Sequence, residues 1–258
     1  GQHFEKPWVE PIANKLFLNQ GSKGGQLSFK NVTEEVGLVP LPMKSPHVEV
    51  NDFDNDGWPD LMVSIVKFVG ERPYPVIFRN QGIRDGLPRF QVTGLDVNDF
   101  PTAEDIATKR TATFFEKMIA DKKIIYAAPA PSGDYDRDGL LDIFLASWWP
   151  EAPSLLLHNE SPAKNFLRVS VRGTKKVNRQ GVGAKIQLYP AGKLGKRDAL
   201  LASQEIALGY GYVSGHAAEA HFGLGDLERV DVEVILPHDE GRRTMKDVKA
   251  NQAIQLSE

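Results

Sequence analysis

The chain has 258 residues, of which 41% are hydrophobic and 25% charged, and its net charge is −3 at pH 7. This balance is that of an ordinary globular protein with room for one or two domains, and it excludes disorder as the default. The absence of cysteine excludes disulfide scaffolds and thiolate metal sites. No apolar run approaches the roughly 18 residues of a membrane-spanning helix, so we expect a soluble protein without membrane insertion.

The charge is unevenly distributed, with an acidic excess in the first 160 residues and a basic excess in the rest. Many of the acidic residues fall in two short loops, where bound cations are expected to offset them. Nothing in the pattern is typical of a nucleic-acid-binding surface. The first residue is Gly1, without a charged-then-apolar leader behind it, and we expect a processed or trimmed product with a tag remnant at Gly1. A removed signal peptide would leave this appearance.

The clearest feature is an internal repeat of an aspartate-rich loop. DFDNDGWPD at residues 52–60 recurs, 82 residues later, as DYDRDGLLD at residues 134–142. Each loop is followed by an apolar predicted strand and then by a second strand that closes on asparagine. These strands are residues 61–66 and 76–80 after the first loop, and residues 143–146 and 155–159 after the second. LFLN at residues 16–19 is a further closing strand without a loop before it, so we expect the chain to begin partway through a repeat.

Residues 102–122, between the two loops, are predicted to form one helix inserted in the repeat. Thr102 and Asp105 make a weak capping box. The helix would carry an approximate apolar stripe formed by Ile106, Phe114, Phe115, Met118 and Ile119. We expect this stripe to pack over a sheet.

After Pro162 the apolar residues alternate with polar ones, as in half-buried antiparallel strands. The predicted inward-facing residues are Leu167, Val169, Val171, Ala184, Ile186, Leu188, Val230, Val232, Val234 and Leu236. Glycine and proline separate these runs at intervals typical of a sandwich or barrel. We therefore predict a repeat domain at residues 1–162, which contains both aspartate loops, and a β-sandwich domain at residues 163–258.

Both loops have the residue pattern of a site for a hard, oxygen-seeking cation. Carboxylates at positions 1, 3, 5 and 9 surround the ion, and glycine at position 6 permits the tight turn. The predicted ligands are the side chains of Asp52, Asp54, Asp56 and Asp60 with the Trp58 carbonyl, and those of Asp134, Asp136, Asp138 and Asp142 with the Leu140 carbonyl. Position 4, Asn55 or Arg137, is expected to point away from the ion.

These loops are not EF-hands, because an EF-hand needs a bidentate glutamate at position 12, where Val63 and Leu145 stand. Magnesium prefers a smaller octahedral site, so we predict Ca²⁺ at two sites. The ion either holds the turn together or also bridges to a ligand, and both roles stay open.

Two other groups of residues are candidate sites. His216 and His221 are five residues apart, which is not the spacing of a zinc helix, and we expect satisfied histidines at a strand end and no catalytic residues. Trp148 and Trp149 form either a platform for a sugar or protein or part of ordinary strand packing.

The two loops, with LFLN at residues 16–19 and FKNVTEEVGL at residues 29–38, resemble FG-GAP/VCBS repeats of integrin-α-type propellers. The second half resembles the ASPIC/UnbV domain. The motifs that carry this resemblance are NFLRVSVRG at residues 165–173, GVGAKI at 181–186, GYGYVS at 209–214, HFGLG at 221–225, and Val230 with Asp231. In that family a propeller precedes the ASPIC/UnbV module in secreted or cell-surface proteins of mostly undefined role.

These resemblances imply an all-β protein: partial or reduced β-propeller-like FG-GAP repeats with one inserted helix, followed by a β-sandwich. A closed propeller usually needs at least four blades, and the chain has two full repeats and a partial one. Either the chain is a piece of a longer propeller, or a reduced, open or oligomer-completed sheet replaces the ring.

The leading functional hypothesis is a secreted, periplasmic or cell-surface calcium-binding protein that acts in adhesion, protein binding or glycan binding, without catalysis. Extracellular modules often bind calcium near millimolar levels, which suits such loops. The alternative is a carbohydrate-active or other hydrolytic enzyme that uses loop carboxylates.

Overall fold

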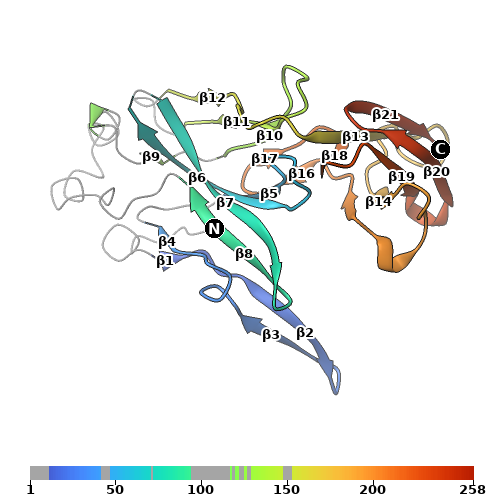
Figure 1. The fold of residues 1–258 in the computed structure, drawn as a ribbon, viewed down its shortest axis with the longest axis horizontal. Coiled ribbons are helices and arrows are strands. Elements are labelled where there is room, and N and C mark those ends of the chain that lie inside the picture. Colours follow the sequence, from blue (N-terminus) through green and yellow to red (C-terminus); the bar gives the residue numbers. More distant parts are fainter. Residues whose placement is uncertain are drawn as a thin grey trace. The chain divides into compact units, whose positions relative to one another are not determined.

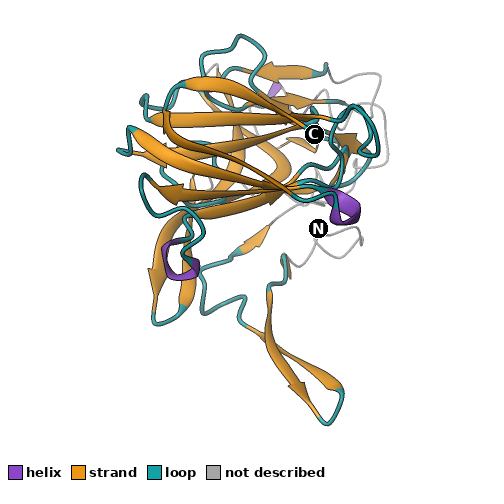
Figure 2. Ribbon diagram, turned by 90° about the vertical axis from the view of Figure 1, so that its right-hand side faces the viewer, coloured by secondary structure: helices purple, strands orange, loops and turns teal. Residues whose placement is uncertain are grey.

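The structure is a computed structural model that describes residues 12–41, 47–70, 72–93, 117, 120–121, 125–126, 129–147 and 153–258. The described part is all-β, as predicted, and strands dominate it (Figure 2). Contacts divide the chain into two units, each assembled from separate segments. Unit 1 comprises Gly1–Asn51, Pro59–Ala130 and Phe144–Leu157, and unit 2 comprises Asp52–Trp58, Pro131–Ile143 and His158–Glu258. Unit 2 therefore holds most of the first aspartate loop, the whole of the second, and residues 163–258.

Unit 1 is built around one antiparallel sheet in the order β5, β6, β7, β8, with β9 also paired to β6 (Figure 1). The strands are β5 (Val48–Asn51), β6 (Asp60–Val69), β7 (Arg72–Arg84), β8 (Leu87–Thr93) and β9 (Ile125–Tyr126). Two further pairs are β1 (Ile12–Ala13) with β4 (Pro40–Leu41), and β2 (Phe17–Lys23) with β3 (Gln26–Asn31). Strands β6 and β7 bury Met62, Val63, Val66, Val76 and Phe78.

The hairpin β2–β3 has the same register as the hairpin β7–β8. Asn19 faces Phe29 in the first and Asn80 faces Phe90 in the second, with an irregularity in register directly after each asparagine. In both, the asparagine Oδ1 accepts a hydrogen bond from the glycine two residues later. The two hairpins are thus copies of one structural element. They differ in burial, because β7 also pairs with β6, whereas among the described strands β2 pairs only with β3.

The predicted helix at residues 102–122 lies outside the described residues except for Lys117, Ala120 and Asp121. Of these, Asp121 N–H donates to the Lys117 carbonyl over 2.8 Å, a bond with helical spacing. Trp148 and Trp149 also lie outside the described residues. In the described part of the chain no helix combines the length and the apolarity that crossing a membrane requires.

The second aspartate loop connects strands of a three-stranded sheet in the order β10, β11, β12. These strands are β10 (Ser132–Gly133), β11 (Asp142–Leu145) and β12 (Leu155–Leu157). In unit 2, Ser132 faces Ile143 and Gly133 faces Asp142 in antiparallel register. The loop therefore joins the two strands of a short hairpin, as a strand–loop–strand site requires.

The rest of unit 2 consists mainly of two sheets. The first has the order β18, β13, β21, and the second β15, β14, β19, β20 (Figure 1). Their strands are β13 (Asn165–Arg172), β14 (Lys185–Pro190), β15 (Ala202–Glu205), β18 (Glu219–Gly225), β19 (Arg229–Ile235), β20 (Arg242–Lys249) and β21 (Gln252–Ser257). A small pair, β16 (Gly209–Tyr210) with β17 (Ser214–Gly215), and two 3₁₀ turns, Arg197–Ala199 and Pro237–Asp239, complete the unit. All pairings are antiparallel except that of β13 with β21.

Both sheets contribute to one cluster of buried apolar side chains. All ten residues predicted to face inward belong to it, together with others such as Phe222, Leu224 and Leu256. Alternation explains β13, where every second residue is buried, because successive side chains of a strand point to opposite faces. Strand β19 departs from it: Asp231 and Glu233 are buried as well as the three valines. The Asp231 carboxylate accepts N–H bonds from Gly192, Leu194 and Asp247, which ties two turns to this strand.

Candidate metal-binding loops

The first aspartate loop is closed by hydrogen bonds from its own backbone to its carboxylates. Asp52 accepts N–H bonds from Gly57 over 2.7 Å and from Asp56 over 3.1 Å, and Asp56 accepts one from Trp58 over 2.8 Å. Asn55 and Gly57 have φ values of 55° and 92°, so the chain reverses sharply at positions 4 and 6. Glycine at position 6 is the residue that adopts this conformation without strain.

The second loop repeats this conformation. Asp134 accepts the Gly139 N–H over 3.1 Å, and Asp138 accepts the Leu140 N–H over 2.8 Å. Arg137 and Gly139 have φ values of 66° and 94°, as their counterparts do in the first loop. The sequence repeat is therefore also a repeat of backbone geometry.

The closing asparagines of the repeats anchor the aspartates at position 9. In unit 1 the Asn80 N–H donates to Asp60 Oδ1 over 2.7 Å. In unit 2 the Asn159 N–H donates to Asp142 Oδ1 over 2.8 Å. Each asparagine side chain also donates to the carbonyl that precedes its aspartate. The asparagine that ends each predicted strand thus fixes the position of the last carboxylate of the loop by hydrogen bonding.

Carboxylate oxygens converge in both loops. Within the continuous first loop, Asp52, Asp54 and Asp60 each offer an oxygen within 4.8 Å of the others. The second loop contains two such groups. One consists of Asp134, Asp136 and Asp138, and the other of Asp136, Asp142 and His158. Seven of the eight predicted carboxylates belong to these groups, and the exception is Asp56. The roles predicted for the carbonyls of Trp58 and Leu140 stay predictions.

Burial disfavours the ionised form of one carboxylate in each loop. Burial raises the pKa of Asp52 to about 6; the N–H of Gly57 opposes this rise and the nearby Asp56 carboxylate adds to it. Burial also raises the pKa of Asp142, against the N–H groups of Asn159 and Tyr135. Carboxylates in this situation are stabilised in their ionised form by a nearby positive charge.

Asp134 carries a buried carboxylate oxygen that lacks a hydrogen-bond partner among the described residues. Its side chain is 1% exposed, and its Oδ2 accepts from Gly139 and lies 3.2 Å from Arg168 Nη1. Its Oδ1 is buried and has no hydrogen-bond partner among the described residues. Buried carboxylate oxygens are normally paired or coordinated, so this residue fits a metal-binding role.

Asn55 has a structural role that its sequence position did not reveal. Its side chain is 1% exposed, and its Nδ2 donates to the Gly139 carbonyl over 2.9 Å. Its Oδ1 lies 2.8 Å from His221 Nε2, and its carbonyl accepts the Gly225 N–H over 2.8 Å. Position 4 of the first loop therefore holds together three segments of unit 2. The corresponding Arg137 is exposed.

The glycine and the histidine of the HFGLG motif at residues 221–225 both contact the first loop. A side chain at Gly223 would place its Cβ 2.0 Å from Asp52 Oδ2 and 2.5 Å from Asn55 Cα. Gly223 thus allows the loop to lie directly against β18. Burial, with a smaller effect of Arg168, lowers the pKa of His221 to about 4. Its ring is therefore neutral at pH 7, and Nε2 is the nitrogen that donates to Asn55.

The expectation of satisfied histidines at a strand end is wrong for His221. This residue lies inside β18, and its buried Nδ1 has no hydrogen-bond partner among the described residues. The ring stacks on Phe166 with centroids 6.0 Å apart. His216 follows β17 and contacts the Tyr210 ring edge-on at 4.8 Å.

The comparisons with known proteins concern mainly the C-terminal part. Residues 173–258 match the family model described as "ASPIC and UnbV". Cartilage acidic protein 1 from human and from mouse is in each case 27% identical over 250 residues. The alignment covers 95% of this chain and 32% of each relative, so the chain spans about a third of the length of these curated relatives.

A solved structure from Bacteroides fragilis, provisionally described as a cell adhesion protein, aligns with 96% of this chain and 88% of its own. Its identity is 9% and its TM-score 0.20, which carries no argument about the fold. The comparisons therefore support an ASPIC/UnbV domain in the C-terminal third of the chain.

Proposed function

We propose that the two aspartate loops bind Ca²⁺ and that the protein is a calcium-stabilised binding module. Oxygen atoms of carboxylates are the ligands that calcium prefers, and six to eight of them usually surround the ion. Asp52, Asp54, Asp56 and Asp60 with the Trp58 carbonyl would hold one ion. Asp134, Asp136, Asp138 and Asp142 with the Leu140 carbonyl would hold the other.

The observation that carries this proposal is the buried, unpaired Oδ1 of Asp134 beside two further carboxylates. Arg168 neutralises part of the charge, but it is bonded to the other oxygen of Asp134. A divalent ion among the three carboxylates would pair the remaining oxygen and offset their mutual repulsion. Both loops share one backbone geometry, so the same argument supports an ion in the first loop.

We further propose that these loops belong to FG-GAP/VCBS-like repeats of a partial or reduced propeller, followed by a β-sandwich formed by the two sheets of unit 2. The equal registers of β2–β3 and β7–β8 support repeated units. The single apolar cluster shared by the two sheets of unit 2 supports a sandwich.

The proposed setting is outside the cytoplasm, in a secreted, periplasmic or cell-surface protein, where millimolar calcium fills such loops. The proposed partner is a protein or a glycan, or a second copy that completes the repeat sheet, and no catalysis is involved. Glycan arrays and assays of glycoside hydrolysis in calcium buffer separate this proposal from its alternative. Binding without turnover supports it, and turnover that is lost with a loop aspartate supports a carbohydrate-active enzyme.

Calorimetric titration with calcium tests the metal sites directly. The wild-type protein is expected to bind two ions, and Asp54→Ala and Asp136→Ala one each, because each change removes one ligand from one loop. Asp198→Ala is the control, because this exposed aspartate lies in a 3₁₀ turn outside the loops. No heat of binding, together with equal melting temperatures in EDTA and in millimolar calcium, would refute both sites.

A further inference from the structure

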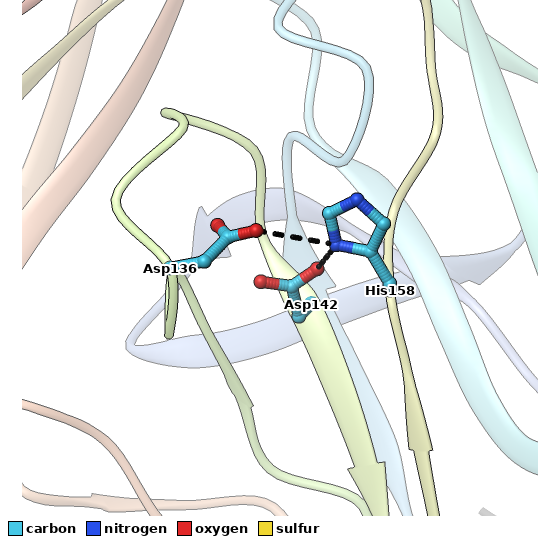
Figure 3. Close-up of side chains that lie close together, drawn as sticks. All are labelled: Asp136, Asp142 and His158. Atoms are coloured by element: carbon cyan, nitrogen blue, oxygen red, sulfur yellow. Dashed lines mark ion pairs between the residues drawn. The ribbon is translucent and has the colours of Figure 1, made fainter.

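A histidine nitrogen that the repeat pattern does not require lies beside two carboxylates of the second loop. His158 Nδ1 lies 3.5 Å from Asp136 Oδ2 and 3.3 Å from Asp142 Oδ1 (Figure 3). The three side chains point toward one another from the loop, from the start of β11 and from the residue after β12 (Figure 3). The side chains of Asp136 and His158 are 34% and 43% exposed, whereas that of Asp142 is 1% exposed.

We propose that this group binds a divalent transition-metal ion of the zinc class, held by Asp136 Oδ2, Asp142 Oδ1 and His158 Nδ1. The inference rests on the proposed function in one respect: the ion would share two aspartates with the proposed calcium site, so the two metals compete for the second loop. The first loop would remain a calcium site.

The geometry suits such an ion. Zinc lies about 2.0–2.2 Å from histidine nitrogen and carboxylate oxygen, so neighbouring ligand atoms of a tetrahedron are about 3.4 Å apart. The separations of His158 Nδ1 from Asp142 Oδ1 and Asp136 Oδ2, 3.3 and 3.5 Å, match this edge. The exposed side of the group leaves the fourth position to water, as in open zinc sites.

The ligand types point to the same class of metal. Imidazole suits zinc, copper, iron and nickel, whereas calcium and magnesium take oxygen ligands almost exclusively. A site with two carboxylates and one imidazole therefore discriminates in favour of a transition metal relative to an all-oxygen loop.

Backbone hydrogen bonds from Asn159 and Tyr135 hold the Asp142 carboxylate in place. Its Oδ1 accepts the Asn159 N–H over 2.8 Å and its Oδ2 the Tyr135 N–H over 3.3 Å. Hydrogen bonds of this kind orient metal ligands and raise affinity. Asp136 also belongs to the neighbouring group with Asp134 and Asp138, where Asp134 Oδ1 is buried and has no hydrogen-bond partner among the described residues.

The first repeat provides an internal comparison. The residue before its closing asparagine is Arg79, at the position that His158 occupies in the second repeat. A guanidinium cannot act as a metal ligand because it stays protonated. The two loops are thus alike in their aspartates and different in the one residue that decides whether a nitrogen ligand is present.

The test is titration of the full chain with ZnCl₂ by calorimetry, after removal of metals, beside a parallel titration with calcium. His158→Gln is expected to weaken zinc binding at least about tenfold, since it removes one of three ligands. It should change calcium affinity by less than about threefold, because imidazole is not a calcium ligand. His238→Gln is the matched control, an exposed histidine outside the acidic groups, and should leave zinc affinity within about twofold.

Equal zinc affinity in wild type and His158→Gln, or no zinc binding, would overturn the inference. Long-range ¹H–¹⁵N spectra of the wild-type protein give an answer that does not depend on the variant folding. Zinc must shift the Nδ1 resonance of His158, and an unshifted resonance overturns the assignment. Calcium binding without zinc binding defeats this inference alone, and zinc binding through His158 without calcium binding defeats only the proposed calcium function.

Discussion

Asn55 Oδ1 lies 2.8 Å from His221 Nε2, although 166 residues separate the two in sequence. The same asparagine side chain donates to the Gly139 carbonyl of the second loop. One buried amide thus connects the two aspartate loops and β18 within unit 2. Replacing Asn55 is therefore expected to lower the stability of the fold, although position 4 of the loop is not a predicted metal ligand.

Asn55→Ala is expected to lower the free energy of unfolding by about 2–4 kcal/mol, because it leaves the His221 Nε2–H and the Gly139 carbonyl buried without partners. Arg137→Ala, at the same position of the second loop but exposed, should change it by less than about 0.5 kcal/mol. Urea unfolding in EDTA measures both without a contribution from calcium. Equal losses for the two variants would show that the Asn55 contacts do not stabilise the fold.

Protonation of His221 should destabilise the protein in mild acid. Burial holds its pKa at about 4 in the folded state, below the ordinary value of 6.5. Between these values the unfolded chain binds more protons than the folded one, so this stabilising contribution is complete above pH 6.5 and is lost as the pH falls toward 4. The loss is on the order of 3 kcal/mol. His221→Gln, which keeps a donor for Asn55, should show a flatter dependence of unfolding free energy on pH in that window, and an unchanged slope would contradict the assignment.

Glu258 should stabilise unit 2 except in strong acid. Its carboxylate accepts N–H bonds from Lys176, Thr174 and Lys175, which lower its pKa to about 2 from an ordinary 4.5. A depressed pKa gives a contribution that is complete above about pH 4.5 and disappears as the pH falls through 2. Glu258→Gln should therefore reduce the melting temperature at pH 6 and make no difference at pH 2. A difference that persists at pH 2 would point to a cause other than the charge.

Gly223→Ala should disrupt the contact of the first loop with β18, because the new Cβ would meet the Asn55 backbone at 2.5 Å. Overpacking of this kind costs about 1–3 kcal/mol. The control is Gly209→Ala, where no atom lies within 4 Å of the new Cβ and the backbone φ is not positive. Thermal unfolding of both variants, with wild-type stability expected for the control, checks this prediction.

A fragment of residues 163–258 is expected to fold by itself and to ignore calcium. Its apolar cluster is drawn entirely from these residues, and no aspartate loop is included. The fragment should be less stable than the full chain, since the loop that pairs with His221 is missing. Circular dichroism and denaturant unfolding with and without calcium test this, and an unfolded spectrum would refute the proposed independence.

Local patterns predicted the strands well, because alternation and turn residues act over short distances. The buried set of β13, β14 and β19 follows from period-two spacing alone. The sequence repeat also predicted the turn geometry of both loops, since glycine at position 6 and aspartates at alternate positions dictate it. Even the closing asparagines were visible as a pattern, although their task of fixing Asp60 and Asp142 was not.

The sequence by itself therefore determined an all-β chain, two matching aspartate loops and the residues of the C-terminal core. Only the tertiary structure decided that the first loop contacts β18 and the second contacts β13, that Asn55 is buried on His221, and that His158 joins Asp136 and Asp142. These facts depend on pairs of residues far apart along the chain. The residues next to either partner in sequence do not reveal such a contact, because the packing of distant segments determines which side chains are buried and which residues they contact.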